Sequence, residues 1–344
     1  MIAEQLFGKS ALVFAAAAAT VLAGTLPSTA PSTDRGAKPK IPVILDTDIG
    51  DDIDDTWALA VLLRSPELDL KLVVGDNGNA IYRAKLLAKF LQRAGRTDVP
   101  VGIGLRPEEK RGPQSAWIEG YDLKSYPGKV HEDGVKAIID TIMSSTEPVT
   151  VIAIGPVPNL AAALERQPEI AKRAHLVGMH GSVRKGYNGG KNVAAEYNVK
   201  CNPKACQKVF TAPWDITITP LDTCGIVRLK DQKYRAIRDS KDPIAVALIE
   251  NYRAWSASHK NPAQADSASS ILFDTVAVYL AFSEQLLTME KLGIRVTDDG
   301  FTVMDDKAKA VNVATEWKDL PGFEDLLVKR LTSAEGAASS RPRD

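Results

Sequence analysis

The sequence predicts an α/β fold in which a mostly parallel central sheet carries helices on both faces. Short apolar runs rich in β-branched residues alternate with amphipathic segments along most of the chain, and no internal repeat is present. Continuous apolar runs are typical of strands buried on both faces, and intervening helices allow such strands to run parallel. Sheets of this kind bind ligands at the carboxyl ends of their strands.

Six runs are predicted as strands, and the segments between them as helices. The strands are expected at 41–46, 70–76, 99–104, 149–155, 175–181 and 215–222. The helices are expected at 54–65, 80–95, 132–145, 158–174 and 202–210.

Beyond about residue 230 the pattern changes. Helical segments are expected at 242–260, 269–287 and 322–331, and a β-hairpin-like pair at 293–306 and 309–317. We therefore expect one domain over residues 41–335, with C-terminal helices and a β-hairpin added to the sheet.

Charge and hydropathy argue against a nucleic-acid partner and against a membrane span in the body of the chain. The 344-residue chain has 43 Lys plus Arg and 43 Asp plus Glu, so its formal net charge is zero. This balance argues against a nucleic-acid partner, which requires a concentrated basic surface. After residue 40, no apolar run is long enough to cross a bilayer.

The N-terminus has a different composition. Lys9 precedes an Ala/Val/Leu run and the small-residue stretch 28–30, an order typical of a secretory signal peptide. We predict a signal peptide over residues 1–30 and a secreted or periplasmic protein; the alternative is an uncleaved membrane anchor. Residues 31–40 are predicted to be a leader, and residues 336–344 a disordered tail.

Three cysteines, Cys201, Cys206 and Cys224, have no spacing typical of a zinc site, and an odd number cannot all pair within the chain. A disulfide among them and buried free thiols are the two alternatives.

The stretch 41–63, IPVILDTDIGDDIDDTWALAVLL, places six aspartates within ten positions between a predicted strand and a predicted helix. A helix N-terminus stabilises an anion by at most about 1 kcal/mol, which explains one or two of them, such as Asp54 or Asp55. The rest are better explained by a hard divalent cation, and Ca²⁺ accepts about six to eight oxygen ligands. We therefore predict a site for a hard divalent cation here.

Two other acidic motifs fit less well. An EF-hand is excluded because Gly50 stands at the wrong loop position and a strand, not a helix, precedes the loop. A phosphotransferase of the haloacid dehalogenase type also begins with a strand and D-x-D. This chain lacks the Thr/Val pattern after the glycine and a matching downstream lysine motif.

The stretch VILDTDIGDDIDDTWAL resembles the N-terminal signature of the inosine–uridine nucleoside hydrolase family. The resemblance continues, in family order, in GDNGNA, IAIGPVPNLAAAL, VGMHGSV, AEYNVKCNPKA and LFDTVAVYL. It spans nearly all of residues 41–330, and six blocks in order are far more specific than one.

The resemblance implies hydrolysis of the N-glycosidic bond of ribonucleosides to ribose and free base, with one bound Ca²⁺. It also implies a small-molecule nucleoside as substrate, and a homo-oligomer, since relatives are commonly dimers or tetramers. The implied metal ligands are Asp48, Asp55, the carbonyl of Ile154, and Asp274, with Asp48 also the general base toward a calcium-bound water.

The resemblance further implies that Asp54 and Asn79 hold ribose hydroxyls, with Asn198 beside them and Glu196 toward the 5′ end. Tyr187 lies in the glycine-rich loop 184–190, which is placed to close over the sugar.

Elementary chemistry supports these roles. A cation lowers the pKa of nearby water, so that an ordinary aspartate can take its proton. Carboxylates and amide oxygens stabilise the positive charge that develops on ribose in an oxocarbenium-like transition state. A lone carboxylate at Asp274, in an apolar stretch, would cost several kcal/mol unless paired or metal-bound.

The later motifs also have simpler interpretations. GPVPN fits a strand-to-helix turn with Pro156 near the first helical position, and the polar residues of EYN at 196–198 fit a surface loop.

The chain departs from the family pattern at three places. DIGDDIDD is longer than the commoner D-P-G-x-D-D, so Asp51 or Asp52 could replace an aligned aspartate. Phe273 stands where purine-cleaving relatives often have a histidine, a candidate acid for the leaving base. Asn202 stands where many relatives have an aspartate.

Without that histidine, another proton donor is needed for a purine. The candidates are His180, His259, Tyr187 and Tyr197, and Trp255 is a candidate to stack on the base or to lie in the core.

Two further functions remain open from the sequence. One is hydrolysis of another N-ribosyl compound, and the other is non-catalytic calcium-dependent binding of ribose or a nucleoside. Retention of both Asp48 and Asp55 favours a hydrolase, since binding alone does not require a base beside the metal.

Overall fold

The computed structural model describes residues 39–105 and 111–333. The predicted signal peptide, most of the predicted leader and the predicted C-terminal tail lie outside these residues.

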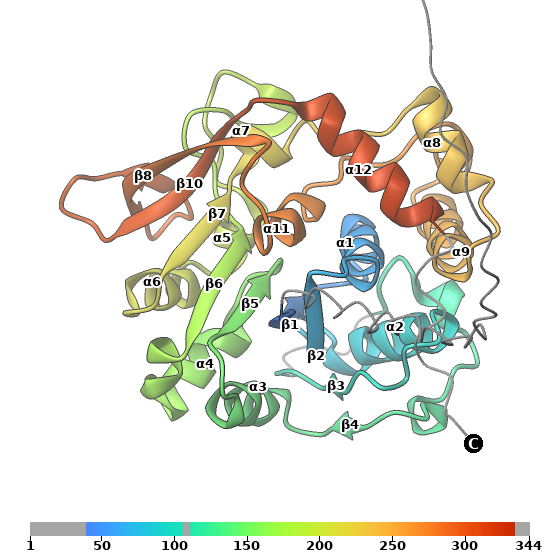
Figure 1. The fold of residues 1–344 in the computed structure, drawn as a ribbon, viewed down its shortest axis with the longest axis horizontal. Helices are drawn as coiled ribbons and strands as arrows, with labels where there is room; N and C mark the ends of the chain where they lie inside the picture. Colours follow the sequence, from blue (N-terminus) through green and yellow to red (C-terminus); the bar gives the residue numbers. More distant parts are fainter. Residues whose placement is uncertain (1–38, 106–110, 334–344) are drawn as a thin grey trace, which may run out of the picture. The chain divides into compact units, whose positions relative to one another are not determined.

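The described residues form a ten-stranded sheet with the order β4-β3-β2-β1-β5-β6-β7-β10-β8-β9 (Figure 1). Its strands are β1 (Ile41–Thr47), β2 (Leu68–Gly75), β3 (Val101–Gly102), β4 (Val130–His131), β5 (Val149–Ala153), β6 (Ala174–Met179), β7 (Ile216–Thr219), β8 (Leu287–Val296), β9 (Thr302–Met304) and β10 (Ala310–Trp317). The strands from β4 to β10 in this order pair in parallel. Strand β8 pairs antiparallel with β10 and β9 with β8, which confirms the mostly parallel sheet and the added hairpin.

Twelve α-helices accompany the strands within the described ranges. They are α1 (Asp54–Leu63), α2 (Ala80–Arg93), α3 (Gly134–Ser144), α4 (Pro158–Arg166), α5 (Tyr197–Cys201), α6 (Pro203–Thr211), α7 (Leu221–Cys224), α8 (Asp231–Arg238), α9 (Pro243–Ser258), α10 (Gln264–Ser267), α11 (Thr275–Leu280) and α12 (Leu320–Thr332). Among the described residues, no helix combines the length and apolar character needed to span a bilayer.

Both faces of the sheet are buried, because successive strand residues point to opposite sides. In β1, Val43 and Leu45 pack into one apolar core, while Ile44 packs into the other. The first core is completed by α1, α2, α9, α11 and α12, and the second by α3, α4 and α6 (Figure 1). The near-continuous apolar character of β1 follows from this double burial.

Several helices differ from the predicted segments for local reasons. The segment 269–287 is helical over Thr275–Leu280. Its first residues are not helical, and there the Ser269 hydroxyl accepts the Leu229 N–H and donates to the Ser270 carbonyl. Its last residue, Leu287, begins β8. Helix α4 ends at Arg166 because Pro168 restricts the residue before it and lacks an N–H. It begins at Pro158, as predicted, so Pro156 lies before the first helical position and the simpler interpretation of GPVPN is wrong on this point.

The short elements β4, α7, α8 and α10 were not anticipated from the periodicity, which is weak over so few residues. All three cysteines are free; Cys206 and Cys224 are buried and Cys201 is exposed, so the disulfide alternative is not realised.

Parallel pairing fixes where the functional residues meet. Asp46 of β1 lies opposite Ala153 of β5, and Ala153 lies opposite Gly178 of β6. Asp48, Ile154 and Met179, which follow these positions, therefore leave the sheet at one edge. This is the carboxyl edge at which such sheets bind ligands.

Candidate active site

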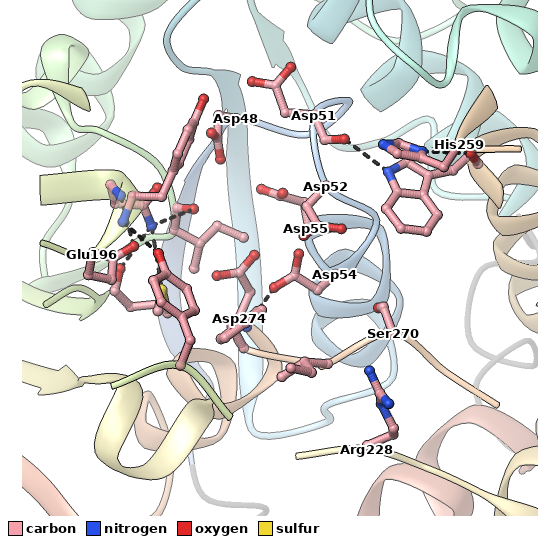
Figure 2. A pocket seen from close by; sticks show the side chains of 18 of the residues that line it. Asp48, Asp51, Asp52, Asp54, Asp55, Glu196, Arg228, His259, Ser270 and Asp274 are labelled. Carbon is pink, nitrogen blue, oxygen red and sulfur yellow. Dashed lines mark hydrogen bonds between the residues drawn. The ribbon is translucent and has the colours of Figure 1, made fainter. Parts of the chain in front are cut away.

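A cavity of about 560 Å³ opens at the carboxyl edge of the sheet (Figure 2). Eight of the nine predicted site residues line it, the exception being Asn79. The cavity is lined by Asp48, Asp51, Asp52, Asp54, Asp55, Ile154, Met179, Tyr187, Glu196, Tyr197, Asn198, Arg228, Trp255, His259, Gln264, Ser270, Ile271, Phe273 and Asp274.

The lining of the cavity has three parts. The carboxylate floor is Asp48, Asp54, Asp55 and Asp274; the Glu196 wall is Glu196, Tyr197 and Asn198; the α9 wall is Trp255, His259 and Gln264. Figure 2 shows Glu196 and His259 on opposite sides, with the carboxylates between them.

The carboxylate floor gathers four acidic side chains that are almost inaccessible to water, each 2% to 5% exposed. Asp48 follows β1, Asp54 and Asp55 begin α1, and Asp274 directly precedes α11. One carboxylate oxygen from each of Asp54, Asp55 and Asp274 lies within 4.8 Å of the others. Asp48 borders the same cavity but is outside this group of three.

Short polar contacts fix these carboxylates. The Thr47 hydroxyl donates to Asp55 Oδ1 at 2.5 Å and accepts the Ile49 N–H at 3.0 Å. Asp54 Oδ2 accepts the Asp274 N–H at 3.3 Å. The N-terminus of α1 and the start of α11 are thereby joined across the floor.

The carboxylate floor is electrostatically unfavourable without a bound cation. Burial raises the pKa of Asp54, Asp55 and Asp274 well above the ordinary value, and repulsion from neighbouring carboxylates raises it further. Burial also raises the pKa of Asp48 to about 7, although the nearby Arg83 charge opposes this shift. Without a positive partner, the charged forms are unfavourable. All the donors are carboxylate oxygens, the ligand type that Ca²⁺ and Mg²⁺ prefer.

A buried arginine positions the acidic loop between β1 and α1. Arg83 is 2% exposed, and its Nη1 donates to the carbonyls of Asp48 and, at 2.8 Å, Ile49. Its Nη2 donates to Asp51 Oδ2 at 2.8 Å, and its Nε to the Asn77 carbonyl. We did not predict this residue; the available signal was a lone arginine among the residues of α2 that face the core.

The same loop depends on a glycine. Gly50 has φ +112°, and a Cβ there would lie 2.5 Å from Tyr82 Cε1 and 2.6 Å from Leu86 Cδ1. The Tyr82 hydroxyl donates to the Gly50 carbonyl at 2.9 Å. Only a residue without a side chain allows α2 to pack this closely under the acidic loop.

Asn79, predicted to hold a ribose hydroxyl, is not among the residues that line the cavity. Its side-chain oxygen accepts the Tyr82 N–H at 3.0 Å, so it caps the N-terminus of α2. The buried Asp76 just before it accepts the Asn77 and Val157 N–H groups, each at 2.7 Å. Asp76 thereby holds Val157, whose φ of 59° lies in the left-handed region, beneath the turn that carries Ile154.

The Glu196 wall lies on the opposite side of the cavity from His259. Glu196 is buried and accepts N–H groups from Gly181 at 2.9 Å and Asn198 at 2.8 Å. Burial raises the pKa of Glu196 to about 7, although these hydrogen bonds oppose the shift. Asn198 Nδ2 donates to the Met179 carbonyl at 3.0 Å and the Ile154 carbonyl at 3.4 Å.

The loop that carries Tyr187 is anchored rather than free. The buried Asp222 accepts the N–H groups of Val183 at 2.9 Å and Arg184 at 2.7 Å. The Tyr187 hydroxyl accepts the Tyr197 N–H at 3.0 Å, and the Tyr187 ring meets Phe273 edge-on with centroids 6.1 Å apart. Phe273 therefore supports the loop instead of offering a proton.

The four candidate leaving-group acids divide into two groups. His180 is fully buried, bonds the Gly155 carbonyl through Nε2 at 3.0 Å, and is not part of the cavity lining. His259, Tyr187 and Tyr197 all line the cavity. Trp255, the candidate stacking residue, also lines it and is 9% exposed.

The two remaining departures from the family pattern also have structural accounts. Asn202 Oδ1 accepts the Ala205 N–H at 3.1 Å and caps α6, a task that aspartate performs equally well. Asp51 and Asp52 line the cavity but are outside the three-carboxylate group, which contains the aligned Asp54 and Asp55.

Comparison with known proteins identifies this arrangement. Residues 43–325 match the family model described as "Inosine-uridine preferring nucleoside hydrolase". The chain belongs to this family. It is therefore an enzyme, a nucleoside hydrolase that cleaves the N-glycosidic bond of small-molecule ribonucleosides.

Similar nucleoside hydrolases have differing base preferences in their names. A non-specific ribonucleoside hydrolase, RihC, of Klebsiella pneumoniae is 35% identical over 231 residues, which cover 64% of this chain and 74% of that protein. A pyrimidine-specific ribonucleoside hydrolase, RihA, of an Enterobacter species is 28% identical over 310 residues, covering 85% and 97%.

Among solved structures, a purine-preferring ribonucleoside hydrolase from Gardnerella vaginalis has a TM-score of 0.69 and 26% identity, with 85% of this chain and 98% of that chain covered. Because these nucleoside hydrolases differ in the base that they prefer, family membership does not define the base preference of this one.

Proposed function

We propose that this nucleoside hydrolase releases ribose and free base from ribonucleosides in a calcium-dependent reaction with Asp48 as general base. The observation that carries the proposal is the carboxylate floor, where buried like charges lie together at the bottom of a cavity of nucleoside size.

The residues present fit a hard divalent cation. The proposed protein ligands are Asp48, Asp55, Asp274 and the carbonyl of Ile154, all of which line the cavity. Asp54 belongs to the same close group, and its proposed task is to accept hydrogen bonds from ribose hydroxyls. Calcium, when bound, neutralises the floor and acidifies a neighbouring water.

Asp48 accepts the proton of the water that attacks C1′. It is suited to this because its backbone is held by Arg83 and its carboxylate borders the cavity.

The remaining residues hold the sugar and stabilise its developing charge. Asn198, Glu196 and Tyr187 all line the cavity. Their proposed tasks are to contact ribose, Glu196 toward the 5′ hydroxyl and Tyr187 from the anchored loop. The positive charge on an oxocarbenium-like ribose lies above the carboxylate floor, where Asp54 stabilises it most directly.

The test is release of ribose from inosine, uridine, adenosine and cytidine, with Ca²⁺ and with a chelator. We expect turnover by the wild type that is lost on chelation and restored by Ca²⁺. The Asp48→Asn variant is expected to lose about 10³-fold in kcat, because general base catalysis is worth about 10²- to 10⁴-fold. Asp215→Asn, at a side chain that is 94% exposed, is the matched control and should retain full activity.

Two outcomes would change the proposal. Turnover that is unaffected by the chelator would show that the reaction does not depend on calcium. Absence of ribose release from all four nucleosides by folded, Ca²⁺-loaded protein would direct attention to another N-ribosyl compound. The non-catalytic alternative is not retained, since the family membership shows an enzyme.

We further propose that residues 1–30 direct export, on the basis of their composition alone. Fractionation of cells that express the full chain, followed by N-terminal sequencing, tests this proposal.

A further inference from the structure

The α9 wall contains the one histidine that borders the cavity. All four histidines of the chain lie in its described part. His131 lies on β4, His175 near the start of β6, and His180 is buried outside the lining. Only His259 combines an imidazole with access to the cavity.

The His259 ring is held in one orientation. Its Nδ1 lies 2.9 Å from the Trp255 carbonyl and 3.2 Å from Ser258 Oγ. Its ring lies against the Trp255 indole, with centroids 4.2 Å apart and planes inclined by 34°. Since a carbonyl can only accept, Nδ1 carries the proton in that bond, and Nε2 is left for a ligand.

The indole that supports His259 is itself tied to the acidic loop. Trp255 Nε1 donates to the Asp51 carbonyl at 3.0 Å (Figure 2). This bond connects the end of α9 to the loop that carries Asp48. The imidazole is therefore positioned relative to the carboxylate floor, although His259 is an exposed residue.

Two features of negative charge lie beside the imidazole. His259 is the C-cap residue of the 16-residue helix α9, and helix C-termini favour a positive charge. The Asp52 carboxylate, which also lines the cavity, is close enough for the two charges to interact.

The other cavity donors are weaker acids. Burial raises the pKa of Tyr187 to about 12, and burial also raises the pKa of Tyr197. A general acid works best when its pKa lies near the working pH, which an imidazole satisfies and these phenols do not. Phe273 has no proton to offer.

We propose that His259 is the catalytic acid that protonates the leaving base through Nε2. This inference rests on the proposed function and adds the residue that protonates the leaving group. The bond from C1′ to the base nitrogen breaks, and its electron pair goes to the base, which takes the Nε2 proton. The water oxygen bonds to C1′, and its proton goes to Asp48. Proton exchange with solvent restores neutral His259 to imidazolium and Asp48 to carboxylate.

The test compares two kinds of leaving group in the Ca²⁺-loaded full chain. Inosine and uridine release bases that benefit from protonation, whereas 4-nitrophenyl β-D-ribofuranoside releases a weakly basic phenolate that does not. For His259→Gln we expect kcat/KM to fall about 100-fold or more on both nucleosides and less than about 3-fold on the nitrophenyl riboside. The matched control is His175→Gln, at an exposed histidine distant from the cavity, which should change neither rate.

The outcomes are distinguishable. An equal loss on nucleosides and nitrophenyl riboside would show a structural role for His259, and unchanged nucleoside turnover would show no role. Either result overturns the inference and leaves the proposed function intact. Failure of the wild type to hydrolyse any of the three substrates would overturn both.

Discussion

The carboxylate floor and the α9 wall border the same cavity but hold their polar groups in different ways. The four floor carboxylates are at most 5% exposed, and they arise from a strand end and two helix starts. The α9 wall instead presents the exposed His259 and the partly exposed Gln264 around the C-terminus of one helix.

This difference separates two kinds of constraint. Buried carboxylates that repel one another are stable only with a compensating cation, so every floor residue is coupled to its neighbours. A side chain at an exposed helix end interacts with solvent and can be exchanged with little effect on folding. We therefore expect changes at the floor to affect metal binding, activity and stability together, and changes at the exposed His259 and partly exposed Gln264 to affect catalysis and substrate binding with little effect on stability.

Asp274→Asn is expected to give the largest effect. Removing one charged ligand should lower Ca²⁺ affinity and reduce kcat/KM by about 10³-fold, since such charge stabilisation is worth several kcal/mol. The same change should raise the melting temperature of the metal-free protein, because it removes a repelling buried charge. Calorimetric Ca²⁺ titration and thermal unfolding in chelator measure the two effects.

Asp266→Asn, at an exposed carboxylate on α10, is the control and should change neither quantity. Unchanged Ca²⁺ affinity in Asp274→Asn would contradict the assignment of this residue to the metal.

Arg83→Met should have the next largest effect. The substitution removes every donor that Arg83 supplies to the Asp48 and Ile49 carbonyls and to the Asp51 carboxylate. The free energy of unfolding should fall by about 3 kcal/mol, as expected when a buried charged partner is removed. We expect kcat to fall by about 10- to 100-fold, because Asp48 is no longer held in place.

Urea unfolding and ribose release measure these changes. Arg93→Met, on the same helix but at a side chain 47% exposed, should lose less than about 0.5 kcal/mol. Equal losses for the two variants would show that Arg83 has no special relation to the acidic loop.

The fold could be predicted wherever the pattern was long and periodic. The six predicted parallel strands are all present, although the one predicted at 99–104 covers only Val101–Gly102. Double burial makes the central strands β1 and β5 near-continuous apolar runs. The start of the segment 269–287 could not be predicted correctly, since the Ser269 hydroxyl accepts the N–H of the distant Leu229 and donates to the adjacent Ser270 carbonyl instead of entering a helix. Such tertiary hydrogen bonds have no periodic signature.

The residues of the site also divide into those that the sequence predicts and those that it does not. The floor residues Asp48, Asp54, Asp55 and Asp274 belong to recognisable motifs, and the structure brings them together. Arg83 was missed because its function depends on α2 packing beneath the acidic loop, which the sequence of α2 does not reveal. Asn79 was placed in the site from its motif, but the structure uses its side chain to cap α2.

Trp255→Phe should give the smallest effect and the clearest separation of the two regions. Phenylalanine retains an aromatic ring beside His259 but loses the Nε1–H that donates to the Asp51 carbonyl at 3.0 Å. One neutral hydrogen bond contributes about 0.5–1.5 kcal/mol, so the expected rise in KM for inosine is about 2- to 10-fold. Ca²⁺ affinity should not change, because no floor carboxylate contacts the indole.

The matched control is Trp317→Phe. Its Nε1–H also donates to a backbone carbonyl, that of Thr223 at 2.8 Å, but the residue does not line the cavity. Trp317→Phe should lower the free energy of unfolding about as much as Trp255→Phe does, without a change in KM. If Trp255→Phe weakened Ca²⁺ binding as strongly as Asp274→Asn, loss of the hydrogen bond to the Asp51 carbonyl would have to displace the metal ligands. The floor and the α9 wall would then act as one coupled unit through the loop between β1 and α1.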